Sequence, residues 1–223
     1  MRLAYLVDVH DHLAAASAAL EEIGDVDLLL IGGDITTGGS PDDAERAIST
    51  LRSLVPRLFA VAGNMDSPAI DARLEELGVS LDRRGVVVDG VGLFGVSAAP
   101  RSPLNTPYEL DEDELARRIE TASGQVASSS SRIFSPHAPP RGTACDRLPS
   151  GEHVGSEAVR RFVEREQPEL VLCGHIHESR GPDRLGRSRI VNPGPAAAGH
   201  YAVVETAPEL VIRLDGEKSP VAF

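Results

Sequence analysis

The chain has few of the residues that mark disulfide-bonded, membrane-embedded or nucleic-acid-binding proteins. Its 223 residues include only two cysteines, no tryptophan and a single lysine, Lys218. Cys145 and Cys173 have no paired spacing, so neither a disulfide framework nor a thiolate zinc site is indicated. No apolar run approaches the ~20 residues of a membrane span, and too few residues precede Asp8 for a secretory signal. We therefore expect a cytoplasmic protein with no membrane partner.

Positive charge is also scarce, because the net charge at neutral pH is −12 and nearly all cations are arginine. Such a surface repels nucleic acid and anionic membranes, so we expect neither as a partner. The excess of acids resembles that of proteins from salt-rich cytoplasm, although genome composition alone can favour arginine over lysine. The length suits one large domain or two small ones, and no linker divides the chain. We expect residues 1–223 to form a single domain.

What the chain does contain is a series of five polar clusters, each preceded by an apolar run that predicts a buried strand. The clusters are Asp8-Val9-His10, Gly33-Asp34, Gly63-Asn64-Met65-Asp66, His137 and Gly174-His175-Ile176-His177. Open α/β sheets build their sites at the polar ends of parallel strands. Side chains alternate in an extended segment, so Asp8 with His10, and His175 with His177, should each project to one side and grip a metal ion.

The residue types in these clusters favour a pair of divalent metal ions. Oxygen and imidazole nitrogen without thiolate suit manganese, iron, nickel or zinc better than calcium. Seven ligands are too many for one tetrahedral zinc and suit two ions ~3.5 to 4 Å apart that share a carboxylate. The seven are Asp8, His10, Asp34, Asn64, His137, His175 and His177, with Asp34 as the candidate shared ligand. Two divalent ions, two carboxylates and a bridging hydroxide leave a positive centre, which suits attack by that hydroxide on a small phosphoester.

Each cluster taken singly also has an ordinary structural explanation. Gly33-Asp34 can be a turn, Asn64 an Asx-turn residue, and His137 a hydrogen-bonded core histidine. Asp66 precedes Ser67-Pro68 and can assist a helix start. The joint order and strand context of the clusters favour the metal site.

Together the motifs DxH, GD, GNxD, a lone His and GHxH resemble those of the calcineurin-like metallophosphoesterases, from about Asp8 to His177. Val191-Asn192-Pro193-Gly194 is similar to a turn in the smaller bacterial and archaeal members. The resemblance implies an α/β fold, a four-layer αββα sandwich of two mixed β-sheets flanked by helices. It also implies two metal ions, with manganese as our first choice. One would be held by Asp8, His10, Asp34 and His177, and the other by Asp34, Asn64, His137 and His175. It makes Asp66 a partner of these ligands, and we include Asp34, Asn64, Asp66 and His137 among the catalytic residues.

One position departs from the family pattern. Many members read GNHD, where the histidine donates a proton to the leaving oxygen, whereas this chain has Met65, whose thioether cannot donate. The departure is shared with a small phosphodiesterase-like branch, and it favours phosphodiesters and stable leaving groups over alkyl monoesters. His12 or His200 are the alternative donors. The competing functions are a non-catalytic interaction scaffold, like a retromer subunit of this family, and a nuclease of the same superfamily.

The remaining pattern predicts alternating β and α elements, followed by more strand. Helices are expected over 11–23, from Ser40-Pro41 onward, over 68–77, from Asp111 onward and over 156–166, with a hairpin at 86–96. Strands near 189–192, 201–205 and 210–214 should complete the second sheet. Two loops, 97–110 and 139–147, can select the substrate, and Arg101 or Arg141 can hold a phosphate oxygen.

Overall fold

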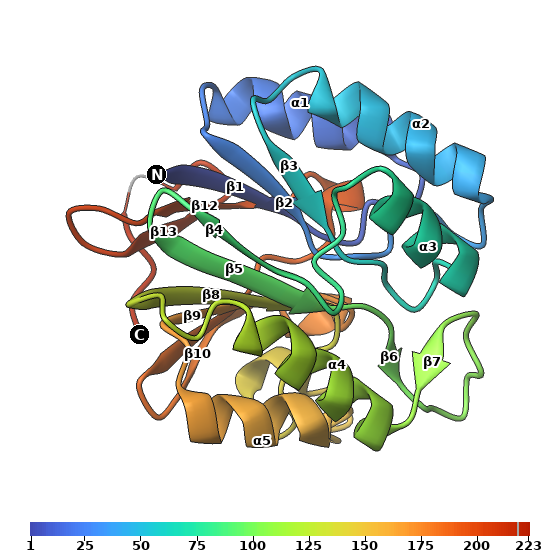
Figure 1. The fold of residues 1–223 in the computed structure, drawn as a ribbon, viewed down its shortest axis with the longest axis vertical. Coiled ribbons are helices and arrows are strands. Elements are labelled where there is room, and N and C mark those ends of the chain that lie inside the picture. Colours follow the sequence, from blue (N-terminus) through green and yellow to red (C-terminus); the bar gives the residue numbers. More distant parts are fainter. Residues whose placement is uncertain (218) are drawn as a thin grey trace.

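The computed structural model describes residues 1–217 and 219–223, which form two stacked β-sheets with helices on both outer faces (Figure 1). The first sheet has the order β13 (Val211–Leu214), β12 (Ala202–Glu205), β1 (Arg2–Leu6), β2 (Leu28–Ile31) and β3 (Leu58–Ala60). The second has the order β10 (Gly181–Leu185), β11 (Ser188–Asn192), β9 (Leu170–Leu172), β8 (Ser131–Pro136), β5 (Val91–Val96) and β4 (Gly85–Val88). Both sheets are mixed, so the predicted fold class is confirmed.

The helices lie outside the sheets, and short elements occupy the loops. The first sheet is covered by α1 (Leu13–Ile23), α2 (Pro41–Arg52) and α3 (Pro68–Glu76), and the second by α4 (Glu112–Gly124) and α5 (Glu157–Glu166). The short elements are the paired strands β6 (Ala99–Pro100) and β7 (Glu109–Leu110) and the 3₁₀ turns η1 (Ala144–Asp146), η2 (His177–Ser179) and η3 (Ala196–Ala198). Among the described residues, no helix has the length and apolar character needed to span a bilayer.

Three apolar layers separate the four structural layers. One strand contributes side chains to two of these apolar layers, because successive side chains point to opposite faces of the sheet. Leu3 and Tyr5 of β1 pack between the sheets, whereas Ala4 and Leu6 pack beneath the helices. Because both faces of such a strand are buried, its sequence is a continuous apolar run rather than an alternating one.

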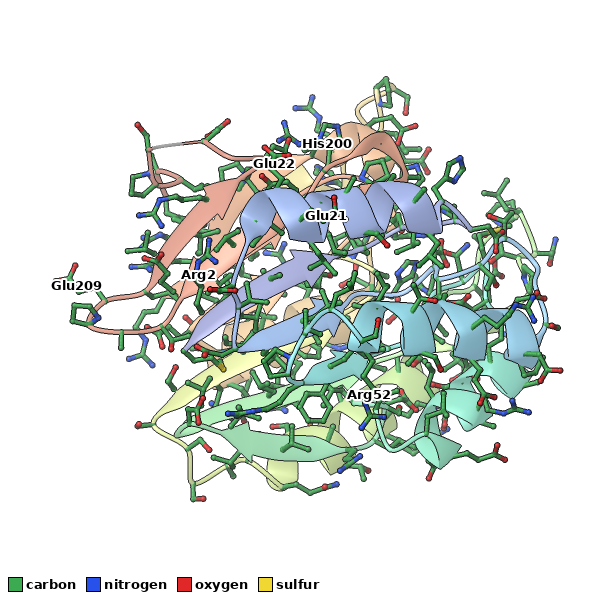
Figure 2. The ribbon with its side chains drawn as sticks, turned by 90° about the horizontal axis from the view of Figure 1, so that it is seen from above. Arg2, Glu21, Glu22, Arg52, His200 and Glu209 are labelled. Carbon is green, nitrogen blue, oxygen red and sulfur yellow. The ribbon has the colours of Figure 1, made fainter. Side chains whose placement is uncertain are left out.

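Helix starts follow the sequence signals closely. Ser40 and Asp43 form a reciprocal capping box, with Pro41 in the first turn. Ser67, Asp111 and Ser156 each accept a hydrogen bond from the backbone amide three residues further on. The solvent side of α1 carries Glu21 and Glu22, which are exposed (Figure 2). The five predicted helices are confirmed, with boundaries shifted by one or two residues where the prediction fixed them.

The last strands correct one prediction. The hairpin β4–β5 is confirmed, and β11 joins the second sheet. However, β12 pairs antiparallel with β1 and β13 pairs with β12, so the chain returns to the first sheet. Strand propensity does not reveal which sheet has an open edge, and here the free edge of β1 accepts the returning chain. Strands β6, β7 and β10 were not predicted.

Strand direction determines where the polar clusters meet. Strands β1, β2 and β3 run parallel to one another, and so do β5, β8, β9 and β11. The loops that leave their carboxyl ends therefore lie at one edge of the sandwich, where all five clusters are found.

Candidate metal centre

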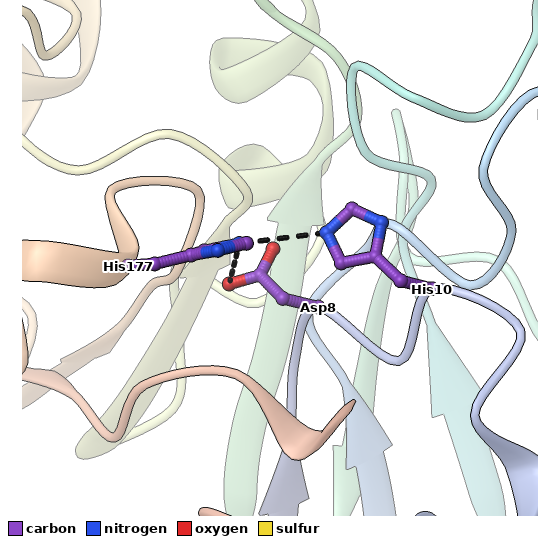
Figure 3. Close-up of side chains that lie close together, drawn as sticks. All are labelled: Asp8, His10 and His177. Atoms are coloured by element: carbon purple, nitrogen blue, oxygen red, sulfur yellow. Dashed lines mark hydrogen bonds and ion pairs between the residues drawn. The ribbon is translucent and has the colours of Figure 1, made fainter. Parts of the chain in front are cut away.

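Two groups of three side chains that could hold a metal ion form at this edge, from loops far apart in the sequence. Asp8, His10 and His177 make the first group, and Asp34, His137 and His175 make the second. Within each group one ligand atom per residue lies within 4.8 Å of the others. Figure 3 shows the His177 ring in contact with both other residues: its Nε2 lies 3.6 Å from Asp8 Oδ2 and 3.4 Å from His10 Nε2.

Asp34 connects the two groups. Its Oδ2 atom lies 3.6 Å from His10 Nε2 of the first group and 3.5 Å from His137 Nε2 of the second. Asn64, the seventh predicted ligand, places Oδ1 2.9 Å from His137 Nε2. All seven predicted ligands are therefore brought together, and one carboxylate oxygen faces both sides.

The backbone that presents these side chains is not extended, which corrects the argument from alternating side chains. Asp8, His10, Asp34 and His175 have φ of 56°, 47°, 49° and 69°. These are left-handed conformations, which cost an L-residue other than glycine roughly 1 to 2 kcal/mol each. As a result, His175 and His177 do not share a metal group but contribute to different ones. Four strained ligands in one site indicate that the surrounding structure maintains them for a function.

Contacts around the rings show that the site suits a cation. His137 Nδ1 donates to the Gly32 carbonyl oxygen at 2.8 Å, so in the neutral ring Nε2 carries a lone pair. That lone pair faces Asn64 Oδ1 and Asp34 Oδ2. This nitrogen and the two oxygens are all electron-rich, so they repel one another unless a proton or a metal ion lies between them. The oxygen and nitrogen donors therefore fit a borderline divalent ion.

The pKa shifts of the buried groups agree with that demand for positive charge. Burial favours a neutral His137, but the charges of Asp34 and Asp8 outweigh it and raise the pKa to about 9. Burial favours a higher pKa for Asp34, but the charge and hydrogen bond of His137 and the hydrogen bond from the Met65 amide outweigh burial and lower the pKa. Burial and the charge of His137 lower the pKa of His175 to about 4. At neutral pH His137 therefore carries a second ring proton whereas His175 is neutral, so the site already attracts one positive charge.

Asp66 fastens together the loops that carry Asp34 and Asn64. It is fully buried and accepts hydrogen bonds from the amides of Ile35, Thr36 and Gly63 at 2.9 to 3.1 Å, and from the Thr36 hydroxyl at 3.0 Å. Its side chain is not the cap of α3, because Ser67 has that role. The alternative of a helix-start residue is therefore wrong, and Asp66 is a partner of the ligand loops.

Two supporting residues escaped the sequence analysis. Thr36 is buried and bonds Asp66, and Thr37 Oγ1 lies 3.0 Å from His10 Nδ1, which leaves Nε2 of that ring directed at the cluster. The only available signal was the Thr-Thr pair two residues after Asp34, and threonines in a loop are common.

Glycines in the motifs are required by close approach. A Cβ at Gly63 would lie 2.0 Å from Asp34 Oδ1, and one at Gly33, where φ is 105°, would lie 2.5 Å from His137 Nδ1. Only glycine allows the two loops to come this near to each other.

The other predicted site residues lie around this centre. The Met65 amide donates to Asp34 Oδ1 at 2.7 Å. His12 Nδ1 donates to the His10 carbonyl oxygen, and His200 bonds Asp215. Arg141 pairs with Glu157 of α5 at 3.3 Å, which engages its guanidinium, while Arg101 is exposed beside β6.

An αββα sandwich with paired carboxylate and imidazole groups at the strand ends defines the class of metal-binding phosphoesterases. The match to the calcineurin-like phosphoesterase family model covers residues 1–179, and the chain belongs to that family.

Known proteins agree with this assignment. An uncharacterized protein of Methanocaldococcus jannaschii is 30% identical over 217 residues, which are 95% of each chain. A probable cyclic nucleotide phosphodiesterase of Synechococcus is 28% identical over 155 residues, 69% of this chain and 58% of that one. The crystal structure of a dimetal phosphatase from Danio rerio matches with a TM-score of 0.70 at 13% identity, over 100% of this chain and 99% of that one, and shows the shared fold.

Proposed function

We propose that the protein is a dinuclear metal-dependent phosphodiesterase that hydrolyses a small phosphodiester or a nucleotide. The observation that supports two ions is the position of Asp34 Oδ2, 3.6 Å from an imidazole nitrogen of one group and 3.5 Å from one of the other. A single shared carboxylate between two complete groups is the arrangement expected of a two-metal site. Manganese is the preferred ion, with iron, nickel or zinc as alternatives.

The proposal assigns each side chain a role. Asp8, His10, His177 and Asp34 hold one ion, and Asp34, Asn64, His137 and His175 hold the other. When bound, the ions would lower the pKa of water and withdraw charge from the phosphoryl oxygens. Gly32 and Thr37 fix the orientation of the His137 and His10 rings, and Asp66 holds the two loops in register.

The substrate class follows from what stands at position 65. Met65 cannot protonate a leaving group. Substrates whose leaving group is a stable anion are therefore favoured over alkyl monoesters. The Synechococcus relative is described as a probable cyclic nucleotide phosphodiesterase, which supports a diester substrate.

The test measures metal content and hydrolysis in parallel. Purified protein stripped with chelator is reloaded with each divalent metal, and turnover is followed for bis-p-nitrophenyl phosphate, p-nitrophenyl phosphate and cyclic nucleotides. We expect two manganese ions per chain and faster diester than monoester hydrolysis. Asp34→Asn keeps an oxygen for the Met65 amide but removes the charge, so it should abolish turnover. Asp89→Asn, at the distant β4–β5 turn, is the matched control.

Two other outcomes would replace this proposal. Protein that binds no metal and hydrolyses none of these esters would favour the interaction scaffold. Degradation of single-stranded DNA in preference to the small diesters would favour the nuclease, against the acidic charge of the chain.

A further inference from the structure

A buried polar cluster behind Asn64, outside the seven candidate ligands, holds the segment that ends in this residue. We call Asp71, Ser97 and Tyr108 the Asp71 clamp. Asp71, in the first turn of α3, uses both carboxylate oxygens: Oδ1 accepts from Ser97 Oγ and Oδ2 accepts from Tyr108 OH, each at 2.8 Å. All three residues are at most 4% exposed. The clamp therefore joins α3 to the two ends of the loop between β5 and α4, which lie on the same side of the molecule (Figure 1).

The same two partners of Asp71 grip the backbone on both sides of Gly63. Ser97 Oγ accepts from the Ala62 amide at 2.9 Å, and the Tyr108 amide donates to the Asn64 carbonyl oxygen at 3.0 Å. Ala98 adds a third bond, from its amide to the Ala62 carbonyl at 2.9 Å. The segment 62–64 is thus fixed at its first and last residues by groups that meet at one carboxylate.

Charged groups around the clamp provide its remaining hydrogen-bond partners. Arg118 donates to Tyr108 OH at 2.6 Å and to Asp82 Oδ2 at 3.0 Å, and lies 3.6 Å from Asp71. Asp82 Oδ1 in turn accepts from the Ser97 amide at 3.0 Å. One arginine, whose side chain is 12% exposed, therefore contacts three carboxylates and a phenol, which belong to Asp71, Asp82, Glu114 and Tyr108. Removing one member of such a network costs more than an isolated hydrogen bond, because its partners are left unpaired.

We propose that the Asp71 clamp is a positioning device for Asn64, so that Asp71, Ser97 and Tyr108 set the affinity of one of the two metal positions without touching the ion. The proposal rests on the proposed function for the identity of the ligand. It assigns a role to the loop 97–110 that differs from substrate selection, since its buried end faces the backbone of Asn64. Outer contacts of this kind typically change metal affinity by about 10- to 100-fold.

The first experiment needs no metal. Amide hydrogen exchange is measured on chelator-treated wild type, Tyr108→Phe and Asp71→Asn. Tyr108→Phe removes only the hydroxyl, so the amide of residue 108 can still reach Asn64. We expect exchange of the amides of Ala62 and residue 108 to rise about tenfold in both variants, because the backbone bonds open more often. Unchanged exchange would overturn the clamp.

The second experiment measures Mn²⁺ binding by calorimetry, with Tyr201→Phe as the control. Tyr201 is also buried, but its side chain lines a cavity with Arg2 and Glu22 and takes no part in the Asp71 clamp. We expect Tyr108→Phe to weaken one of two ions about tenfold and to leave the other unchanged, while Tyr201→Phe changes neither.

A double-mutant cycle separates positioning from general loss of structure. In an Asn64→Ala background the ligand is gone, so Tyr108→Phe should cause no further loss of metal affinity. An equal loss in both backgrounds would contradict a role through Asn64. If wild type binds two ions and Tyr108→Phe binds them with the same affinity, the positioning role of the clamp is wrong, and the proposed function is unaffected. Wild type that binds neither Mn²⁺ nor iron, nickel or zinc overturns the proposed function and the positioning role together.

Discussion

The substitution Asp66→Asn tests whether the ligand loops are held by one buried carboxylate. Asp66 accepts two backbone amides on Oδ2 and one amide and one hydroxyl on Oδ1. Asparagine keeps one oxygen and replaces the other with an NH₂ group, which faces donors. With NH₂ in place of Oδ2 two hydrogen bonds from backbone amides are lost; with NH₂ in place of Oδ1 the Thr36 hydroxyl can turn and accept, and the bond from the Thr36 amide is lost.

The expected loss of stability follows from those one or two bonds. Hydrogen bonds to a charged group contribute about 1.5 to 3 kcal/mol each, so the loss amounts to about 1.5 to 6 kcal/mol. The neutral amide is easier to bury than the carboxylate, which offsets part of this, and we expect a net loss of about 2 to 4 kcal/mol. Burial, together with the charge of Asp34, raises the pKa of Asp66 to about 6, so the comparison is made at pH 8, where the carboxylate is ionised.

Urea unfolding with chelator present measures this loss, and Asp146→Asn is the matched control. Asp146 is also fully buried and accepts three backbone amides and one side chain, but it holds the loop around η1. Both variants should shift the urea midpoint by about 1 to 2 M. Only Asp66→Asn should also weaken Mn²⁺ binding, since only Asp66 joins the loops of Asp34 and Asn64. An unchanged midpoint, or equal metal binding in the two variants, would refute this reasoning.

Three further predictions concern the leaving group, acid stability and a helix cap. Met65→His should raise alkyl monoester turnover by about 100-fold, because it adds a proton donor and keeps the hydrogen bond from the residue 65 amide to Asp34. Higher monoesterase activity in wild type than in this variant would contradict the prediction. Burial of Glu109 is outweighed by hydrogen bonds from Ser102 and Thr106, which lower the pKa to about 2. A carboxyl group whose pKa is lowered stabilises the fold above its ordinary pKa near 4.5, and this stabilisation is lost as the pH falls towards 2. The difference in melting temperature between wild type and Glu109→Gln should therefore be present at pH 6 and narrow by pH 2. A difference that stays constant over this range would argue against the prediction. Ser40→Ala removes the capping box of α2 and should cost about 1 kcal/mol in urea unfolding, whereas Ser17→Ala, within α1, should cost little.

Much of the fold could be predicted because its strands and helix starts depend on local sequence. The apolar runs before Asp8 and Asp34 become strands buried on both faces, and Ser40 followed by Pro41 begins a helix as expected. The order of the polar clusters also placed seven side chains at one edge. The association of β12 with β1 could not be predicted, because it depends on which strand edge is left open by the rest of the fold.

Support for the site was harder to predict than the ligands themselves. The neighbours of Asp66 alone indicated a helix-start residue, and only the family resemblance made it a partner of the ligands; its contacts with Thr36 and Gly63 are known only once the two loops meet. Asp71 gave no sequence signal, since an acid in the first turn of a helix is ordinary. Long-range partners of this kind leave no local pattern.

Backbone strain links the ligands to these supports. A left-handed conformation at Asp8, His10, Asp34 and His175 costs roughly 4 to 8 kcal/mol in total, comparable to the whole stability of many domains. If only the local sequence mattered, these residues would leave the left-handed conformation, because none of them is glycine. The strain persists because amides and carbonyls around each ligand are fixed from elsewhere: the Asp8 and His10 amides bond the carbonyls of Gly33 and Asp34, and the His175 amide bonds Asp8. The ligand loops therefore restrain one another across the sheet edge: the Asp34 loop holds the backbone of Asp8 and His10, and the Asp8 carboxylate holds that of His175.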